Sequence, residues 1–131
     1  MRRRFFLQLG AGTLGALPAV HAATTNPTMD LPLEEATIDQ LGAALRAQQT
    51  TAVQLVRRYA ERIAQLDRAG PQLRSVIELN PDAEAIAAQL DREAAAGRWR
   101  GPLHGVPIVV KDNIATADAM QTSAGSLALV G

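Results

Sequence analysis

The stretch GPLHGVPIVVKDNI, residues 101–114, decides how we interpret this chain. Its first five residues are typical of a turn, and an apolar run follows at residues 106–110. Pro107 suits the start or the edge of a strand. The run 108–110 has no polar alternation, which is typical of a strand that is buried on both faces. We therefore predict a strand that ends at Lys111.

Lys111 is the only lysine among the 13 basic residues of the chain. An ammonium group is costly to bury without partners, so three interpretations are open. In the first, the side chain reaches water or pairs with Asp112. In the second, it is desolvated and acts as a base or a Schiff-base nucleophile, and in the third it binds an anionic substrate group. Functional sites are common at strand ends in α/β proteins, which favours the second and third interpretations. Since adjacent strand residues point to opposite faces, Asp112 need not lie beside the lysine amine.

Two helices are predicted before this segment. Thr37 and Thr51 each begin a capping-box pattern, a hydroxyl residue followed three positions later by Gln. The first helix is predicted over about residues 38–48, and the second runs from Thr51 to Gly70. Gly70 can adopt a left-handed helix cap, and Pro71 cannot continue a helix. The second helix has an apolar stripe typical of core packing, made of Leu55, Val56, Tyr59, Ile63 and Leu66.

A strand and a third helix are predicted between these helices and the lysine segment. Residues 74–79 are short, partly β-branched and bounded by prolines, which favours a strand. A helix is predicted from about residue 82 to residue 96, ending at Gly97. The predicted order of elements is therefore helix, helix, strand, helix and then the strand that ends at Lys111.

Composition excludes several functions. At 131 residues, the chain has room for one ordinary domain. The absence of cysteine excludes disulfides, thiolate metal sites and a cysteine nucleophile. A formal charge of zero and only 3% aromatic residues give no indication of a nucleic-acid partner.

Residues 1–22 are predicted to be a cleavable export signal, which leaves residues 23–131 as the mature chain. Three arginines precede a mostly apolar stretch, and small residues surround the expected cleavage point near Ala22. The sequence RRFFL at residues 3–7 resembles the twin-arginine signal, with a general secretory signal as the alternative. The stretch is too short and glycine-rich for a stable membrane anchor. We therefore expect the twin-arginine export machinery as a partner and a periplasmic or secreted location.

Two motifs carry a resemblance to a known family. Residues 101–114 closely resemble the lysine-bearing segment of amidase signature enzymes, and TSAGSLAL at residues 122–129 resembles the next block of that family. Residues 62–67 lie where those enzymes have an early helix. The resemblance implies the amidase signature fold, an α/β fold with helices on both faces of a large mixed sheet. Only the N-terminal part of that fold is expected in this chain.

The resemblance also implies a mechanism. Enzymes of this family hydrolyse carboxamides through a Ser-cisSer-Lys triad, without a metal or an organic cofactor. Lys111 occupies the position of the lysine, which would act as a general base and take a proton from the bridging serine. Ser123 and Ser126 belong to the earlier block and are not assigned to the triad. We expect both triad serines beyond residue 131, and hence a truncated, inactive and unstable chain.

A narrower resemblance concerns the substrate. Residues 66–71 and 76–83 look like those of bacterial peptide amidases, which remove the C-terminal amide of peptides and release ammonia. Export is compatible with such substrates and argues against the tRNA-dependent amidotransferases of the family. Aliphatic, aryl and urea-derived amides stay open. Two other classes also stay open, a Schiff-base or pyridoxal enzyme that uses Lys111 and a non-catalytic exported remnant or binding protein.

Overall fold

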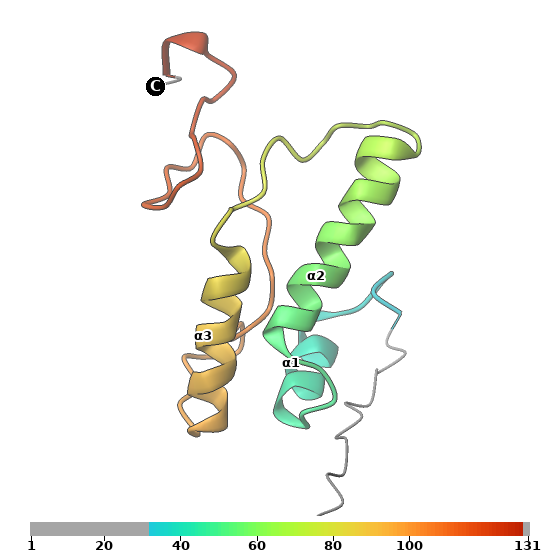
Figure 1. Cartoon of the computed structure of the whole chain (residues 1–131), viewed down its shortest axis with the longest axis vertical. Coiled ribbons are helices and arrows are strands. Elements are labelled where there is room, and N and C mark those ends of the chain that lie inside the picture. The colour runs from blue at the N-terminus through green and yellow to red at the C-terminus, as the bar shows by residue number, and fades with distance from the viewer. Residues whose placement is uncertain (1–31, 130–131) are drawn as a thin grey trace, which may run out of the picture.

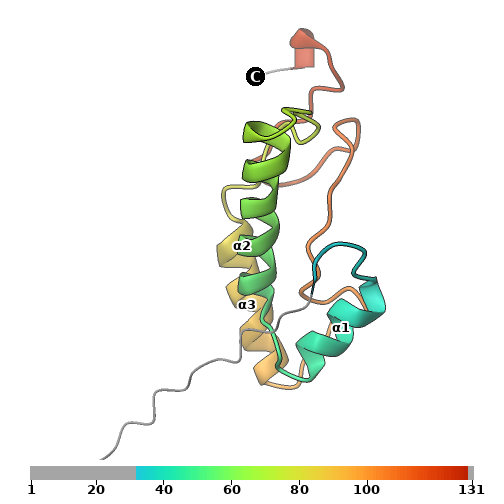
Figure 2. The same cartoon turned by 90° about the vertical axis from the view of Figure 1, so that its right-hand side faces the viewer.

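A computed structural model describes residues 32–129 of the chain. The described elements are, in chain order, α1 (Ile38–Arg46), α2 (Ala52–Arg62), η1 (Ile63–Ala69), α3 (Ala83–Ala95) and η2 (Leu127–Leu129). Helices α2 and α3 lie side by side, and α1 crosses them near one end (Figures 1 and 2). The C-terminal residues of this part extend past the opposite end of the helix pair (Figure 1). The expected export signal, residues 1–22, lies outside the described residues.

Both predicted capping boxes are confirmed. The Thr37 side chain accepts the backbone N–H of Gln40 at 3.2 Å, and the Gln40 side chain accepts the N–H of Thr37 at 2.8 Å. Thr51 and Gln54 make the same reciprocal pair, at 3.1 and 3.0 Å. Both pairs satisfy backbone donors that would otherwise lack a partner in the first helical turn. Local chemistry therefore fixes where α1 and α2 begin.

The long second helix changes character at Ile63. It continues as the π-helical segment η1, and the N–H of Gly70 reaches back to the carbonyl of Gln65 at 2.7 Å. Gly70 ends the helix as predicted, but its φ of −74° is not the left-handed conformation expected of it. A Cβ at this position would lie 2.8 Å from the Gln65 carbonyl oxygen. Glycine is required there for close backbone approach and not for a positive φ.

Helix α3 ends as the sequence predicts. Gly97 adopts the left-handed conformation, with a φ of 73°. Its N–H bonds to the Ala94 carbonyl at 2.9 Å, and the N–H of Arg98 bonds to the Glu93 carbonyl at 2.8 Å. These two bonds form a Schellman motif, which satisfies the last carbonyls of the helix.

The hydrophobic core is small and lies where α1 meets α2. Leu41, Leu45 and Leu55 form its buried cluster, and only Leu55 is completely buried. Leu33, Ala36 and Val106 pack against this cluster from outside. Gly105, with a φ of 80°, comes so close that a Cβ would lie 3.2 Å from Leu45 and Ala52. The turn before the lysine segment is therefore anchored on the core.

The two predicted strands are not formed in the described part of the chain. Residues 72–80 and 106–111 have no strand pairing there, and residues 32–129 contain no sheet. A strand requires backbone hydrogen bonds to a neighbouring strand, and neither segment has such a neighbour in residues 32–129. The apolar run is also exposed rather than buried, by 69% at Ile108 and 82% at Val109. The expected mixed sheet with helices on both faces is thus not formed by these residues, which are helical with extended connections.

Candidate functional site

Lys111 lies at the end of the extended segment that leaves the core. Val106 packs against the leucine cluster, and the segment then runs out along the helix pair (orange in Figures 1 and 2). Lys111 itself is exposed, and its carbonyl accepts the N–H of Ile114 at 2.9 Å in a tight turn. The segment thus presents the lysine at the surface of the described residues instead of in a desolvated pocket.

The Lys111 ammonium makes no ion pair within residues 32–129. Of the interpretations that the sequence left open, pairing with Asp112 is wrong, because that carboxylate is bound elsewhere. Access of the amine to water agrees with its exposure. The desolvated surround that a neutral lysine would need is not provided by the described residues. The assignment of Lys111 as a general base stays a prediction.

The Asp112 carboxylate binds the second motif block. One oxygen, Oδ1, accepts the backbone N–H of Ser123 at 2.9 Å, and Oδ2 accepts the Ser123 hydroxyl at 2.6 Å. The backbone carbonyl of Asp112 accepts the N–H of Ala124 at 3.1 Å. The side-chain and backbone hydrogen bonds from Ser123 lower the pKa of Asp112 below its usual value, although partial desolvation opposes them. The carboxylate is therefore held in its ionised form.

Further hydrogen bonds tie the loop after Lys111 to the segment before α3. Asp118 accepts the Thr116 hydroxyl at 2.8 Å and the N–H of Met120 at 2.9 Å. The Asn80 side chain reaches the same carboxylate at 3.3 Å, and Glu78 accepts the N–H of Gln121 at 3.0 Å. These last two hydrogen bonds join residues that are 38 and 43 positions apart in the sequence, so they fix the loop of small and hydroxyl residues to a much earlier part of the chain.

His104 is the buried ionisable residue nearest to this segment in sequence, and it has a structural role. Its Nδ1 accepts the N–H of Arg100 at 3.2 Å, so Nε2 carries the proton and donates to the Leu90 carbonyl at 2.9 Å. The ring also packs against Trp99, with centroids 4.9 Å apart. Both ring nitrogens are thus used in joining the turn to α3.

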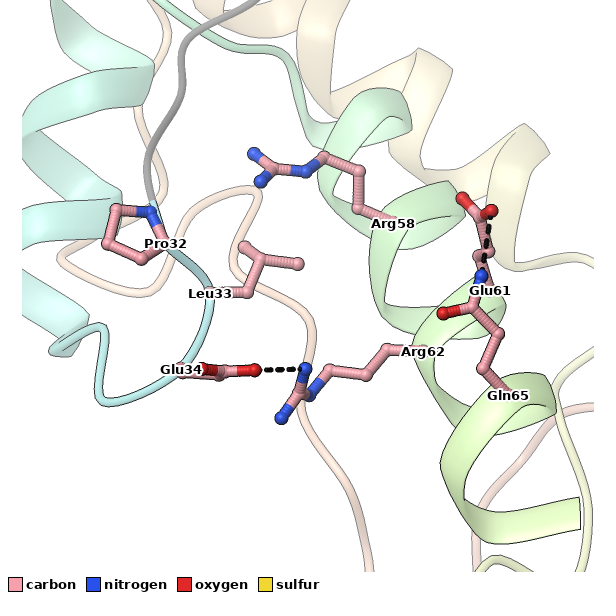
Figure 3. Close-up of a pocket in the computed structure, with 7 residues that line it drawn as sticks. All are labelled: Pro32, Leu33, Glu34, Arg58, Glu61, Arg62 and Gln65. Carbon is pink, nitrogen blue, oxygen red and sulfur yellow. Dashed lines mark hydrogen bonds and ion pairs between the residues drawn. The ribbon is translucent and has the colours of Figure 1, made fainter. Parts of the chain in front are cut away.

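An open groove of about 380 Å³ lies between α2 and the chain that enters α1 (Figure 3). Arg62 pairs with Glu34 across it at 2.8 Å, and Gln65 donates to Glu61 at 3.1 Å. Lys111 is not among its lining residues, which are Pro32, Leu33, Glu34, Arg58, Glu61, Arg62 and Gln65. The groove is lined mainly by polar and charged side chains and is crossed by the Arg62–Glu34 ion pair, and it does not form a pocket around the predicted base.

Membrane-spanning helices and metal clusters are both absent from residues 32–129. None of the helices found there is long and apolar enough to cross a membrane. The same part of the chain brings no three histidine or carboxylate side chains together in a way that could hold a metal ion.

Sequence reasoning singled out Lys111 and missed the roles of Asp112 and Ser123. The spacing of 11 residues between the last two gave no local signal, because their contact depends on how the loop folds back. The signal that could have indicated the contact is the position of the two residues, because Asp112 lies in the first motif block and Ser123 in the second.

The chain matches the family profile described as Amidase over residues 54–131, a range that includes Lys111, Asp112 and Ser123. Among solved structures, it is similar to the native peptide amidase from Stenotrophomonas maltophilia. The two share 54% identity and superpose with a TM-score of 0.73, over 76% of this chain and 20% of that one.

Two sequence relatives belong to different groups. A relative of the amidase class from Schizosaccharomyces pombe is 46% identical over 102 residues, which is 78% of this chain and 17% of the relative. A glutamyl-tRNA(Gln) amidotransferase chain from Chloroflexus aurantiacus is 39% identical over 100 residues, or 76% of this chain and 20% of the relative. The chain thus spans about a fifth of the length of the proteins it matches.

Proposed function

The chain belongs to the Amidase family, and we propose that the whole protein hydrolyses carbon–nitrogen bonds of linear amides with Lys111 as the general base. The observation that carries the proposal is the 54% identity and the shared fold with a solved peptide amidase over 76% of this chain, together with the family match over residues 54–131, which include Lys111. Lys111 also makes no ion pair with a carboxylate within residues 32–129.

The proposed substrates are C-terminal peptide amides, with ammonia as the product. The stronger similarity to a peptide amidase than to an amidotransferase, 54% against 39% identity, supports this choice. In the proposed mechanism, Lys111 takes a proton from a bridging serine, which activates the serine nucleophile. Neither Ser123 nor Ser126 is assigned to these two roles.

The test is ammonia release from a peptide amide by the whole protein, with the free-acid peptide as blank. Lys111→Ala and Lys111→Arg should both reduce kcat by about 10²- to 10⁴-fold, because arginine keeps the charge but does not act as a base at neutral pH. Arg92→Ala, which removes an exposed cation of α3, should leave the rate unchanged. Activity retained in both lysine variants would contradict the assignment.

We also propose that residues 74–79 and 106–110 are strands of a mixed sheet in the whole protein. Their exposed β-branched side chains, including Ile77 at 71% and Val109 at 82%, support this proposal. Slow amide hydrogen exchange at Val109 and Val110 in the whole protein would agree with it. Exchange as fast as in an unfolded peptide would contradict it.

Export by the twin-arginine route, with cleavage near Ala22 and a periplasmic or secreted location, is a further proposal. It is supported by the RRFFL sequence at residues 3–7. A reporter fused after residue 30 should be exported and should begin near Ala23. Replacing Arg3 and Arg4 by lysine should abolish export by the twin-arginine route but leave general secretion working.

A further inference from the structure

The contact between Asp112 and Ser123 joins the two motif blocks at the residue that follows the predicted base. Ser123 donates two hydrogen bonds to the Asp112 carboxylate, at 2.9 and 2.6 Å, and the N–H of its neighbour Ala124 bonds to the Asp112 carbonyl at 3.1 Å. The Ser123 hydroxyl is itself held, because it accepts the N–H of Gly125 at 3.2 Å. Both sides of the contact are thus fixed by more than one bond.

The contact constrains the backbone on the carboxyl side of Lys111. The bond from Ile114 to the Lys111 carbonyl closes a turn, and the bonds to Ser123 fix the residue inside that turn. Upstream, Val106 is fixed against the core. Between these two anchors, residues 108–110 are exposed.

The contact also engages the carboxylate that follows the lysine in sequence. A carboxylate beside an ammonium favours the charged form, and a charged lysine cannot accept a proton. Both Asp112 oxygens are used by Ser123, and no ion pair to Lys111 forms within residues 32–129.

We propose that Asp112, held by Ser123, is a positioning residue for Lys111. Asp112 fixes the backbone next to the lysine, and its carboxylate, bound to Ser123, does not pair with the lysine amine. The proposal rests on the proposed function, because it assigns Asp112 a role only if Lys111 is the base. It concerns this chain's two motif blocks and requires no other group.

The test uses the whole protein and three serine variants. Ser123→Ala removes the hydroxyl donor, and Ser123→Thr keeps it. Ser126→Ala is the control, because it removes a hydroxyl of the same block whose hydrogen bond within residues 32–129 comes from the N–H of Ala128. We expect Ser123→Ala to lower kcat by about 10- to 100-fold, with KM changed by less than about threefold, because small displacements of a catalytic group have effects of this size. Ser123→Thr should recover most of the rate, and Ser126→Ala should leave it unchanged.

The pH profile separates positioning from a merely structural role. The acidic limb of kcat/KM follows deprotonation of the general base. Freeing one carboxylate oxygen in Ser123→Ala favours the charged lysine, so that limb should move to higher pH. If Ser123→Ala only lowered the melting temperature, with the limb and kcat of the folded enzyme unchanged, the proposal would be overturned.

Lys111→Ala, measured alongside, separates this proposal from the proposed function. An inactive Lys111→Ala with a fully active Ser123→Ala would overturn the positioning role alone. An active Lys111→Ala would overturn the general base and the positioning role together. Asp112→Ala removes both carboxylate bonds and should lose more activity than Ser123→Ala, whereas an equal or smaller loss would contradict the role of the carboxylate.

Discussion

The carboxylate of Asp91, on α3, accepts the backbone N–H of Ala52, the first residue of α2, at 2.7 Å. Its second oxygen accepts the N–H of Val53 at 3.2 Å. Thr51 accepts the next free N–H, that of Gln54, so the first three donors of α2 all have partners. A side chain from α3 thus completes the cap of α2 and fixes how the two helices lie together.

Asp91→Ala should therefore lower the free energy of unfolding by about 1–2 kcal/mol, since it leaves two helix donors without acceptors. The measurement is chemical denaturation of the whole protein, together with hydrogen exchange at Ala52 and Val53. Arg57→Ala is the matched control, because it breaks the exposed pair of Arg57 with Glu84 between the same two helices. No measurable change is expected there, and equal effects of the two variants would contradict the capping role.

Gly70→Ala should destabilise the end of η1. The added Cβ would lie 2.8 Å from the Gln65 carbonyl oxygen, and backbone atoms cannot move away as a flexible side chain can. A loss of about 1–3 kcal/mol in the free energy of unfolding is expected. Gly97→Ala gives a comparison, because nothing lies within 4 Å of a Cβ there and the strain comes only from its φ of 73°. Roughly 1–2 kcal/mol is expected for that variant, and a neutral Gly70→Ala would show that the helix end relaxes.

Local signals in the sequence predicted the helices and their ends, but not the contacts between them. Thr37 and Thr51 find their partners three residues away, and Gly97 ends α3 through its own backbone. Asp91 reaches α2 across 39 residues, and no local pattern indicates such a contact. Element ends therefore follow from the sequence, whereas the packing of α3 on α2 does not.

The predicted strands failed for a related reason. The apolar run 106–110 has strand composition, but a strand is a relation between two segments, and residues 32–129 offer it no partner. Lys111 follows this run, and its assignment as the base stays a prediction. Its environment was not predictable, because the burial of the run was inferred from composition alone, and Asp112 turned toward Ser123 instead.

Acid should remove the contribution of Glu93 to stability. Its carboxylate accepts two hydrogen bonds from Arg100, at 2.7 and 2.6 Å, and one from Gln89 at 3.1 Å. The Arg100 bonds are the main reason that the pKa of Glu93 falls from 4.5 to about 2. Because the pKa is lower in the folded state, the contribution is complete above pH 4.5 and is lost as the pH falls through about 2.

Thermal melting of the wild type and of Glu93→Gln checks this expectation. The two melting temperatures should differ at pH 7 and converge as the pH falls from 4.5 through about 2, because Glu93 then becomes protonated and neutral like glutamine. Arg100→Ala should show the same convergence, since it removes the partner. A difference that stayed constant from pH 7 to pH 2 would mean that the carboxylate charge does not stabilise the folded state.

His104→Leu should destabilise the turn before the lysine segment more than its size suggests. The His104 ring is 6% exposed and bridges the N–H of Arg100 and the carbonyl of Leu90, and leucine would leave both groups without partners. A loss of about 1–3 kcal/mol is expected from such unsatisfied groups. Leu103→Ala is the control, because Leu103 is 49% exposed and should change stability little. His104 helps to anchor the turn that precedes the Lys111 segment. His104→Leu should therefore also lower kcat of the whole protein. A stable, fully active variant would show that the bridge does not position the lysine segment.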